Sequence, residues 1–449
     1  MNGDYRIYQW FVELELSHEG YEVEKAFVDG AAVMEALSVK LMAAVCENSQ
    51  EKLLNEIELP LARVLASMER EGFCVDRDGI EKYGDEIGEK LEASLHKVYD
   101  MAGCEFNINS PKQLGDILYD KIGVPASKKR TTDKEYLSKY KDKYPIIDKI
   151  LEYKMLAKIY STYIIGLEEF ISNDGKIHTI FNQTLTRTGR LSSSYPNLQN
   201  IPTRYEYAKL IRKAFLPTND YIMSSDYSQI ELRILAHLSK VPKLIEAFNS
   251  GIDVHTKTAM EVFNVSEAEV NTEMRRQAKA VNFGILYGMS GFGLSESLDM
   301  RIVEANEFID KYFKAFPGIK EYLDNVVVIA KENGFVKTIM DRKRTIDELY
   351  NTNYMIRQTG ERIALNTPVQ GTAADILKKA MIEIYNEFNK RGLKVKMIIQ
   401  VHDELLFDCP LNEQEEVLKI IKDIMENTYK LNVPLKVDIN VGKNWYEAK

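Results

Sequence analysis

The segment LKVKMIIQVHDELLFDCP, from Leu393 to Pro410, restricts the fold of this chain more than any other stretch. Apolar residues alternate on both sides of a short polar centre, a pattern typical of two strands joined by a tight turn. Asp403 lies in that turn, so the sheet would carry its carboxylate to one end. The chain is therefore expected to build part of its core around an antiparallel sheet.

A second strand-like run, YIMSSDYS, carries Asp226 near its end and is followed by QIELRILAHLS, which reads as an amphipathic helix. Phosphoryl transfer needs two hard cations held close together, and Mg²⁺ selects carboxylate oxygens. Asp226 and Asp403 would be the minimal set of ligands for these cations if the fold brought them together. A lone aspartate after a strand is more often a turn former or a helix cap, so neither residue is decisive alone.

The 449 residues are too many for one compact core, which predicts several subdomains around a cleft. Helical patterns fill 56–163 and 231–390, with a helix stop at Gly72 and a helix start at Ser110. Short strands and turns lie between 176 and 226, and the chain closes with the hairpin, an amphipathic helix and a last strand. This order indicates an α+β protein.

Composition excludes some classes of protein. No apolar run is long enough to cross a bilayer, and the four cysteines show no CxxC spacing that would indicate a zinc site or a disulfide framework. These features predict a cytoplasmic protein with no membrane partner. The net charge of -9 argues against a nucleic-acid partner, but between 109 and 160 Lys and Arg outnumber Asp and Glu by twelve to seven. Such basic clusters permit a DNA groove, although most are solvated helix faces.

The segment RRQAKAVNFGILYGMSGFG suggests a binding site for one nucleotide. Arg275, Lys279, Phe283 and Tyr287 recur at intervals of four, which places them along one face of a helix. Two cations could hold the phosphates, while the ring and the phenol could hold the base and the sugar. The alternative is a basic surface helix whose aromatic residues pack inward.

Three segments, in this order, resemble motifs A, B and C of the family A DNA polymerases: DYSQIELRILAHLS, RRQAKAVNFGILYG and QVHDELLF. Further similar stretches lie at 186–202, 251–263 and 365–381, so the resemblance runs from about Glu56 to the C-terminus. It implies a right-hand fold, with a helical thumb and fingers around an antiparallel-sheet palm. The expected segments are an inactive remnant of a 3′–5′ exonuclease domain at 1–55, the thumb at 56–165, the first part of the palm with motif A at 166–237, the fingers with motif B at 238–350, and the second part of the palm with motif C at 351–449.

The resemblance also implies a reaction: template-directed addition of deoxynucleotides to a primer 3′-hydroxyl, with release of pyrophosphate. Asp226 and Asp403 would hold two Mg²⁺ ions with help from the backbone carbonyl of Tyr227. Glu404 would be an auxiliary acidic residue near the primer end. Lys279 would be a candidate general acid toward the leaving pyrophosphate.

Further residues would bind the nucleotide and the DNA. By the resemblance, Arg275, Lys279 and His255 would bind the triphosphate, and Phe283 would disfavour dideoxynucleotides. Glu231, held against Tyr287, would leave no room for a ribose 2′-hydroxyl. The expected contacts to primer–template DNA, many in the nearly degenerate minor groove, are Arg190, Asn197, Gln199, Asn200, Arg204, Arg362, Asn366, Gln370 and His402.

Some features depart from the family pattern. Tyr195 replaces a usual aspartate, Asp341 replaces a common glycine, and the thumb-tip stretch ASKKRTTDKEYLS is short. The N-terminal EVEKAFVDGAAVMEAL resembles only the last helix of the exonuclease domain, with Asp29 near its last metal-binding aspartate and Lys25 replacing a tyrosine. We therefore expect a monomer without proofreading or 5′-nuclease activity.

Two other functions compete with this interpretation. Single-subunit phage-type RNA polymerases share the two-aspartate palm and a fingers helix with Lys and Tyr, but Glu231 and Phe283 distinguish this chain from them. A non-catalytic accessory subunit could keep the fold to bind DNA. Intact Asp226, Lys279 and Asp403 argue against that alternative, because a protein that only binds DNA does not need metal carboxylates.

Overall fold

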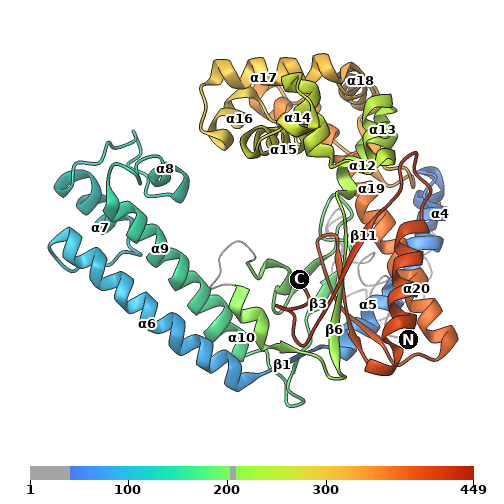
Figure 1. Cartoon of the computed structure of the whole chain (residues 1–449), viewed down its shortest axis with the longest axis horizontal. Coiled ribbons are helices and arrows are strands. Elements are labelled where there is room, and N and C mark those ends of the chain that lie inside the picture. The colour runs from blue at the N-terminus through green and yellow to red at the C-terminus, as the bar shows by residue number, and fades with distance from the viewer. Residues whose placement is uncertain (1–40, 203–208) are drawn as a thin grey trace, which may run out of the picture. The chain divides into compact units, whose positions relative to one another are not determined.

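The computed structural model describes residues 41–202 and 209–449 (Figure 1). Lys25 and Asp29 of the expected exonuclease remnant, and Arg204 of the expected DNA contacts, lie outside these residues. The chain forms two compact units. The described part of the larger unit comprises 41–71, 181–194 and 223–440. The smaller unit comprises 72–180, 195–222 and 441–449, without the undescribed residues.

A four-stranded sheet forms the centre of the larger unit. Its strand order is β11 (Val437–Gly442), β6 (Tyr221–Tyr227), β10 (Glu404–Cys409) and β9 (Lys396–Val401). The last two are antiparallel, with Glu404 opposite Val401, so only two residues form the turn. The hairpin expected from the alternating apolar pattern is confirmed.

Helices with buried faces pack in the same unit as this sheet. The 38-residue α19 (Tyr354–Arg391) is buried almost continuously from Thr367 to Ile382. In α20 (Gln414–Asn427) the buried residues Val417, Ile420 and Ile421 recur at helical spacing. Helix α5 (Leu59–Glu71) ends immediately before Gly72, as the sequence predicted.

The helix expected after Asp226 is present, but the expected exposed polar face is wrong. In α12 (Ile230–Ser239) every residue from Ile230 to Ala236 is buried, including Glu231 and Arg233. The charge of Arg233 is tolerated because its guanidinium donates to the carbonyl oxygens of Ser228 at 2.8 Å and Pro434 at 2.6 Å. This helix lies inside the unit, and its polar residues have specific partners.

A group of helices follows, interrupted near Gly251, Gly288, Pro317 and Gly334 as the sequence predicted. It ends in a hairpin, and at Asp341 the backbone takes φ 63°, the left-handed region that favours glycine. The elements are α13 (Pro242–Ser250), α14 (Val254–Phe263), α15 (Thr272–Leu286), α16 (Gly291–Leu298), α17 (Ile302–Ala315), α18 (Pro317–Asn333), β7 (Phe335–Lys337) and β8 (Lys343–Thr345).

In the smaller unit, α6 (Arg77–Ala102) and α9 (Pro145–Ile159) run side by side (Figure 1). Near one end they enclose an apolar core that includes Val98, Leu114 and Ile147. Helix α7 (Pro111–Gly115) begins with the predicted cap, because the Ser110 hydroxyl accepts from the backbone N–H of Gln113 at 3.5 Å. Further short α-helices and strands, in both units, are α4 (Glu51–Leu53), α8 (Lys134–Ser138), α10 (Gly166–Glu168), β3 (Ile180–Asn182) and β4 (Ser192–Ser194).

The other end of the smaller unit contains a three-stranded sheet, in the order β2 (Lys176–Ile177), β1 (Phe73–Val75) and β5 (Phe215–Leu216). Trp445 is buried against it, with its ring centroid 5.6 Å from that of Phe73 and 5.4 Å from that of Phe215. Within residues 41–202 and 209–449, every helix falls short of the length or the apolar character needed to span a bilayer.

Candidate active site

The sheet brings Asp226 and Asp403 together. Asp226 is the penultimate residue of β6, and Asp403 lies in the turn that leads into the neighbouring strand β10. The backbone N–H of Tyr227 donates to the carbonyl oxygen of Asp403 at 3.2 Å. The two aspartates are therefore attached to adjacent stretches of backbone, although 176 residues separate them in the chain.

A chain of hydrogen bonds and ion pairs runs beside Asp403. Arg190 Nη2 lies 2.7 Å from Glu231 Oε1 and 3.8 Å from Asp403 Oδ1. The Tyr287 hydroxyl donates to Glu231 Oε2 at 2.9 Å, so the contact expected between these two residues is present. Four residues from distant parts of the sequence thus meet at one place in the larger unit.

The electrostatics of this group indicate an excess of negative charge. Burial raises the pKa of Asp403 to about 6, with a further contribution from Glu231, while the Arg190 guanidinium opposes the rise. Burial and the Glu231 carboxylate likewise raise the pKa of Tyr287 to about 12. One arginine is therefore shared between the buried carboxylate of Glu231 and the partly buried carboxylate of Asp403, a setting that favours binding of a further cation.

The donor atoms present fit Mg²⁺. Two aspartate carboxylates and the Tyr227 carbonyl are hard oxygen donors, which this ion prefers. Among the described residues, no group of three or more His, Cys, Asp and Glu side chains is arranged to hold a metal. A site with so few protein ligands suits Mg²⁺, which usually keeps several waters and binds substrate phosphates.

Glu404 and His402 flank Asp403 but differ in their surroundings. The Glu404 carboxylate is buried and accepts from the Ser224 hydroxyl at 2.6 Å, across the pair of strands β6 and β10. His402 occupies the hairpin turn, with φ 55°, and its side chain is exposed to solvent. Of the two residues that flank Asp403, Glu404 therefore lies in the interior of the sheet and His402 lies at its surface.

Helix α15 presents the expected nucleotide-binding residues on one face. Arg275 and Lys279 are exposed, Phe283 is half-buried, and Tyr287 directly follows the helix, whereas residues such as Val281 on the opposite face are buried. The same helix thus packs through one face and leaves two cations and two aromatic rings on the other.

Arg275 has a partner that the sequence did not reveal. Its guanidinium donates to the Asp253 carboxylate at 3.0 and 3.2 Å. Asp253 also caps α14, since it accepts from the backbone N–H of Thr256 at 2.9 Å. This ion pair fixes the start of α14 against α15.

His255 is buried beside Phe283, with 5.7 Å between the ring centroids. Burial lowers its pKa to about 4; Asp253 opposes the change, and Arg275 and Lys279 add to it. The imidazole is therefore neutral near pH 7. The Asn282 amide donates to Nδ1 at 3.1 Å, which leaves the proton on Nε2.

The expected DNA contacts fall into two groups. In the larger unit, Arg362, Asn366 and Gln370 recur every four residues along α19, from an exposed position to a buried one, and Asn366 donates to Gln370 at 3.4 Å. Together with Arg190 and His402 they belong to the same unit as the two aspartates.

The second group, Asn197, Gln199 and Asn200, lies in the smaller unit. The Asn197 side chain accepts from the backbone N–H of Gln199 at 3.0 Å, and the Tyr163 hydroxyl donates to the Asn200 carbonyl at 2.5 Å. Asn197 and Asn200 line a cavity of about 1140 Å³, whose other lining residues include the lysines Lys134, Lys141, Lys149, Lys154 and Lys158.

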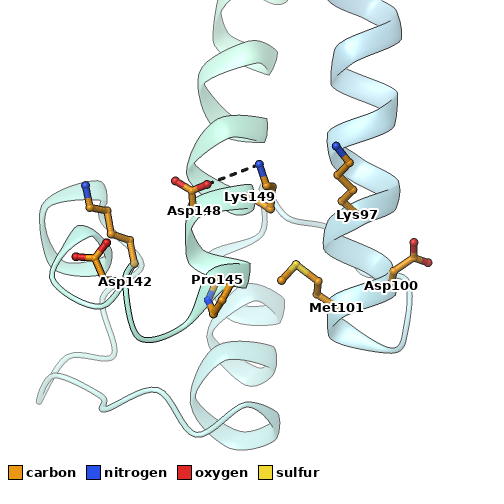
Figure 2. Close-up of a pocket in the computed structure, with 8 residues that line it drawn as sticks. Lys97, Asp100, Met101, Asp142, Pro145, Asp148 and Lys149 are labelled. Atoms are coloured by element: carbon orange, nitrogen blue, oxygen red, sulfur yellow. Dashed lines mark ion pairs between the residues drawn. The ribbon is translucent and has the colours of Figure 1, made fainter.

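A second cavity of about 490 Å³ in the smaller unit shares Lys141, Asp148 and Lys149 with the first and contains none of the expected site residues (Figure 2). It lies between the C-terminal end of α6 and the start of α9, and it is lined by both acidic and basic side chains. Asp148 and Lys149 neutralise each other there at 3.7 Å. The mixed charges give this cavity no clear preference for a ligand.

Comparison with known proteins agrees with this geometry. The family model "DNA polymerase family A" matches residues 77–447. The chain is 48% identical over 426 residues to DNA polymerase I of Geobacillus stearothermophilus and 49% identical over 426 residues to that of Bacillus subtilis (strain 168). These matches cover 93% of this chain but 49% and 48% of the relatives, so the chain spans about half of their length.

A solved structure is also similar. The POL domain of Pol1 from M. smegmatis, in complex with DNA primer-template and dNTP, superimposes with a TM-score of 0.92 at 38% identity and covers 98% of this chain and 79% of that one. The expected α+β polymerase fold is confirmed. The family match over most of the chain leads to one conclusion: this chain belongs to DNA polymerase family A.

Proposed function

We propose that this chain extends a DNA primer by template-directed addition of deoxynucleotides, releasing pyrophosphate. One observation carries the proposal: the end of β6, with Asp226, and the turn that contains Asp403 are adjacent stretches of backbone, in the unit that also contains the cationic and aromatic face of α15. The similar POL domain, solved with primer-template and dNTP, supports the same substrates for this chain.

In this proposal Asp226, Asp403 and the Tyr227 carbonyl hold two Mg²⁺ ions. When bound, the ions would lower the pKa of the attacking hydroxyl and stabilise the charge on the leaving phosphate. The raised pKa of Asp403 supports the placement, because a partly buried carboxylate near Glu231 gains from a nearby cation. Glu404, whose carboxylate accepts from the Ser224 hydroxyl, is the auxiliary acidic residue near the primer end.

The incoming triphosphate binds along α15. Arg275 and Lys279 neutralise the phosphates, and Lys279 donates a proton toward the pyrophosphate. Neutral His255 contributes an N–H donor from Nε2 and no charge. The exposed Arg275–Asp253 pair is worth about 0–1 kcal/mol, so Arg275 can exchange its partner for a phosphate at little cost.

The sugar of the nucleotide is selected by Glu231. Arg190 and Tyr287 hold both oxygens of this carboxylate, so it cannot swing away from an approaching ribose. A 2′-hydroxyl would meet a fixed, buried carboxylate, while a deoxyribose would not. Phe283, on the same face as the phosphate-binding cations, disfavours dideoxynucleotides.

Primer–template DNA binds to residues of both units. In the larger unit these are Arg190, Arg362, Asn366, Gln370 and His402; in the smaller unit they are Asn197, Gln199 and Asn200. The lysines around the cavity that includes Asn197 and Asn200, apart from Lys149, which pairs with Asp148 and Glu152, favour a polyanion. We further propose that the chain acts as a monomer, with the thumb, palm and fingers at the boundaries expected from the sequence.

Primer extension on a defined template with Mg²⁺ tests the proposal. We expect the wild type to add deoxynucleotides in template order and to add ribonucleotides far more slowly. Asp403→Ala should lose activity, whereas Asp310→Asn, at an exposed carboxylate on α17, should keep it. Equal activity of Asp403→Ala and the wild type, or equal use of both sugars, would contradict the proposal.

A further inference from the structure

Four charged side chains that have no role assigned above meet in the interior of the larger unit. We name them the Arg342 cluster: Glu58, Arg342, Asp375 and Lys378. Arg342 Nε lies 2.7 Å from Asp375 Oδ1, its Nη2 donates to Glu58 Oε1, and Lys378 Nζ lies 2.9 Å from the same Glu58 oxygen. Asp375 and Lys378 have side-chain exposures of 0% and 2%.

Buried ion pairs seldom stabilise a protein more than apolar residues of similar volume would. The Arg342 cluster is therefore of interest for the segments that it holds in place. Glu58 closes the helical segment Leu54–Glu58, Arg342 precedes β8, and Asp375 and Lys378 belong to α19. The Thr338 hydroxyl completes the set by donating to Asp375 at 2.6 Å. The cluster thus locks three separate segments to one another.

A tight turn at 186–189 lies directly against this cluster. The backbone N–H of Gly189 donates to the Thr186 carbonyl at 3.2 Å, and Gly189 has φ 82°. A Cβ at Gly189 would lie 2.6 Å from Arg342 Nε, so the guanidinium packs against the turn itself. On α19, a Cβ at Gly371 would lie 3.2 Å from the Thr188 carbonyl oxygen. The turn is therefore held on two sides, by Arg342 and by α19.

The same cluster also holds the residues before the turn. The Gln183 amide donates to the Glu58 carbonyl oxygen at 2.8 Å and to the Glu58 carboxylate. Residues 183–189 are thus attached to Glu58 at one end and to Arg342 at the other. The next residue is Arg190, whose carbonyl accepts from the Thr186 hydroxyl and whose guanidinium lies between Glu231 and Asp403.

We propose that the Arg342 cluster positions Arg190 between Glu231 and Asp403, and that Arg342 is a positioning residue for the reaction. This inference rests on the proposed function. The guanidinium of Arg342 pairs with Glu58 and Asp375, and it acts on Arg190 through the turn. When the turn is displaced, Arg190 leaves Glu231 and Asp403, while Arg275 and Lys279 keep their places on α15.

This reasoning predicts a specific kinetic pattern. Loss of positioning lowers kcat on the order of tenfold or more, since small misplacements of an active-site group carry large costs. The KM for deoxynucleotides, set by α15, changes less than about twofold. Discrimination against ribonucleotides falls, because Glu231 loses one of its two holders. General damage to the fold would instead reduce the amount of active enzyme without changing the choice of sugar.

Gly189→Ala tests the contact while it leaves all four charges in place. Its matched control is Gly392→Ala, at another glycine of positive φ (69°) where an added Cβ would meet no atom within 4 Å. We expect Gly189→Ala to show the kinetic pattern and Gly392→Ala to show wild-type kinetics. Equal behaviour of the two variants would overturn the proposal, because backbone strain alone would then explain the effect.

Arg342→Lys, alone and combined with Arg190→Ala, forms a double-mutant cycle. Lysine keeps the charge but cannot bridge Glu58 and Asp375 as the planar guanidinium does. We expect Arg342→Lys to lower kcat in the wild-type background and to add less than about twofold to the loss of Arg190→Ala. An undiminished loss in the Arg190→Ala background would show that Arg342 acts by another route.

A crystal structure of Gly189→Ala gives a result that does not depend on activity. We expect Arg190 to lie beyond hydrogen-bond distance of Glu231; a retained contact refutes the positioning role. If the wild type extends no primer, the proposed function fails, and this structure still decides whether the cluster positions Arg190.

Discussion

The Tyr287 hydroxyl donates to one oxygen of Glu231, at 2.9 Å, while Arg190 binds the other at 2.7 Å. This doubly held carboxylate lies beside Asp403, on a helix whose first seven residues are buried. A rigid negative group next to the acidic pair suits the exclusion of a 2′-hydroxyl, and it accounts for part of the raised pKa of Asp403.

Glu231→Ala is expected to admit ribonucleotides. Removal of the carboxylate opens space for the 2′-hydroxyl, so the ratio of kcat/KM for deoxynucleotides over ribonucleotides should fall on the order of a hundredfold. Single-nucleotide kinetics with both sugars measure this ratio. Tyr287→Phe, which removes only the hydroxyl that holds Glu231, should shift the ratio in the same direction by less. An unchanged ratio in both variants would place the sugar selection elsewhere.

Arg275→Ala is expected to raise the KM for deoxynucleotides about tenfold or more, because a charge-assisted contact to phosphate contributes roughly 1.5–3 kcal/mol. Arg276→Ala is the matched control: its guanidinium pairs with Glu273 at 2.7 Å and donates to the Leu298 carbonyl oxygen at 3.3 Å. Its KM should stay close to that of the wild type. Equal increases for the two variants would indicate a general electrostatic effect of the helix and not a specific phosphate contact.

Phe283→Tyr is expected to accept dideoxynucleotides. The residue is half-buried on the same face as Arg275 and Lys279, and an added hydroxyl there can supply the hydrogen bond that a sugar without a 3′-hydroxyl cannot make. Competition between dideoxy- and deoxynucleotides in primer extension measures the change. A Phe283→Tyr variant that still rejects dideoxynucleotides would count against the position of Phe283 beside the nucleotide sugar.

His255 is expected to destabilise the fold in acid. Its pKa is about 4 in the folded chain and near 6.5 when unfolded, so the unfolded chain takes up the proton first as the pH falls. Stability should fall between pH 6.5 and 4, by up to roughly 3 kcal/mol. Urea unfolding across this range should show a weaker pH dependence for His255→Gln. His96→Gln, at an exposed histidine, should follow the wild type.

The parts of the fold that the sequence predicted are those set by local patterns. Alternating apolar residues around Asp403 fix the hairpin, the Ser110 hydroxyl caps α7, and the four-residue spacing from Arg275 to Tyr287 fixes one face of α15. In each case the deciding interaction joins residues close in the chain.

The parts that could not be predicted depend on contacts between distant residues. The burial of α12 on all sides comes from its position among other elements, which overrides its own pattern. The ion pairs of Arg275 with Asp253 and of Arg342 with Glu58 leave no mark in residue spacing. The two units are each assembled from three separated segments, so composition along the chain cannot reveal them, and the subdomain boundaries stay a prediction.

The central claim is that Asp226 and Asp403 together hold divalent cations. A crystal of the chain with primer–template DNA, a non-hydrolysable deoxynucleotide and Mn²⁺ in place of Mg²⁺ tests it, because the anomalous signal of manganese locates each ion. We expect two peaks roughly 3.5–4 Å apart, bound by both carboxylates. Peaks elsewhere, or none between these two residues while the nucleotide is bound, would contradict the account.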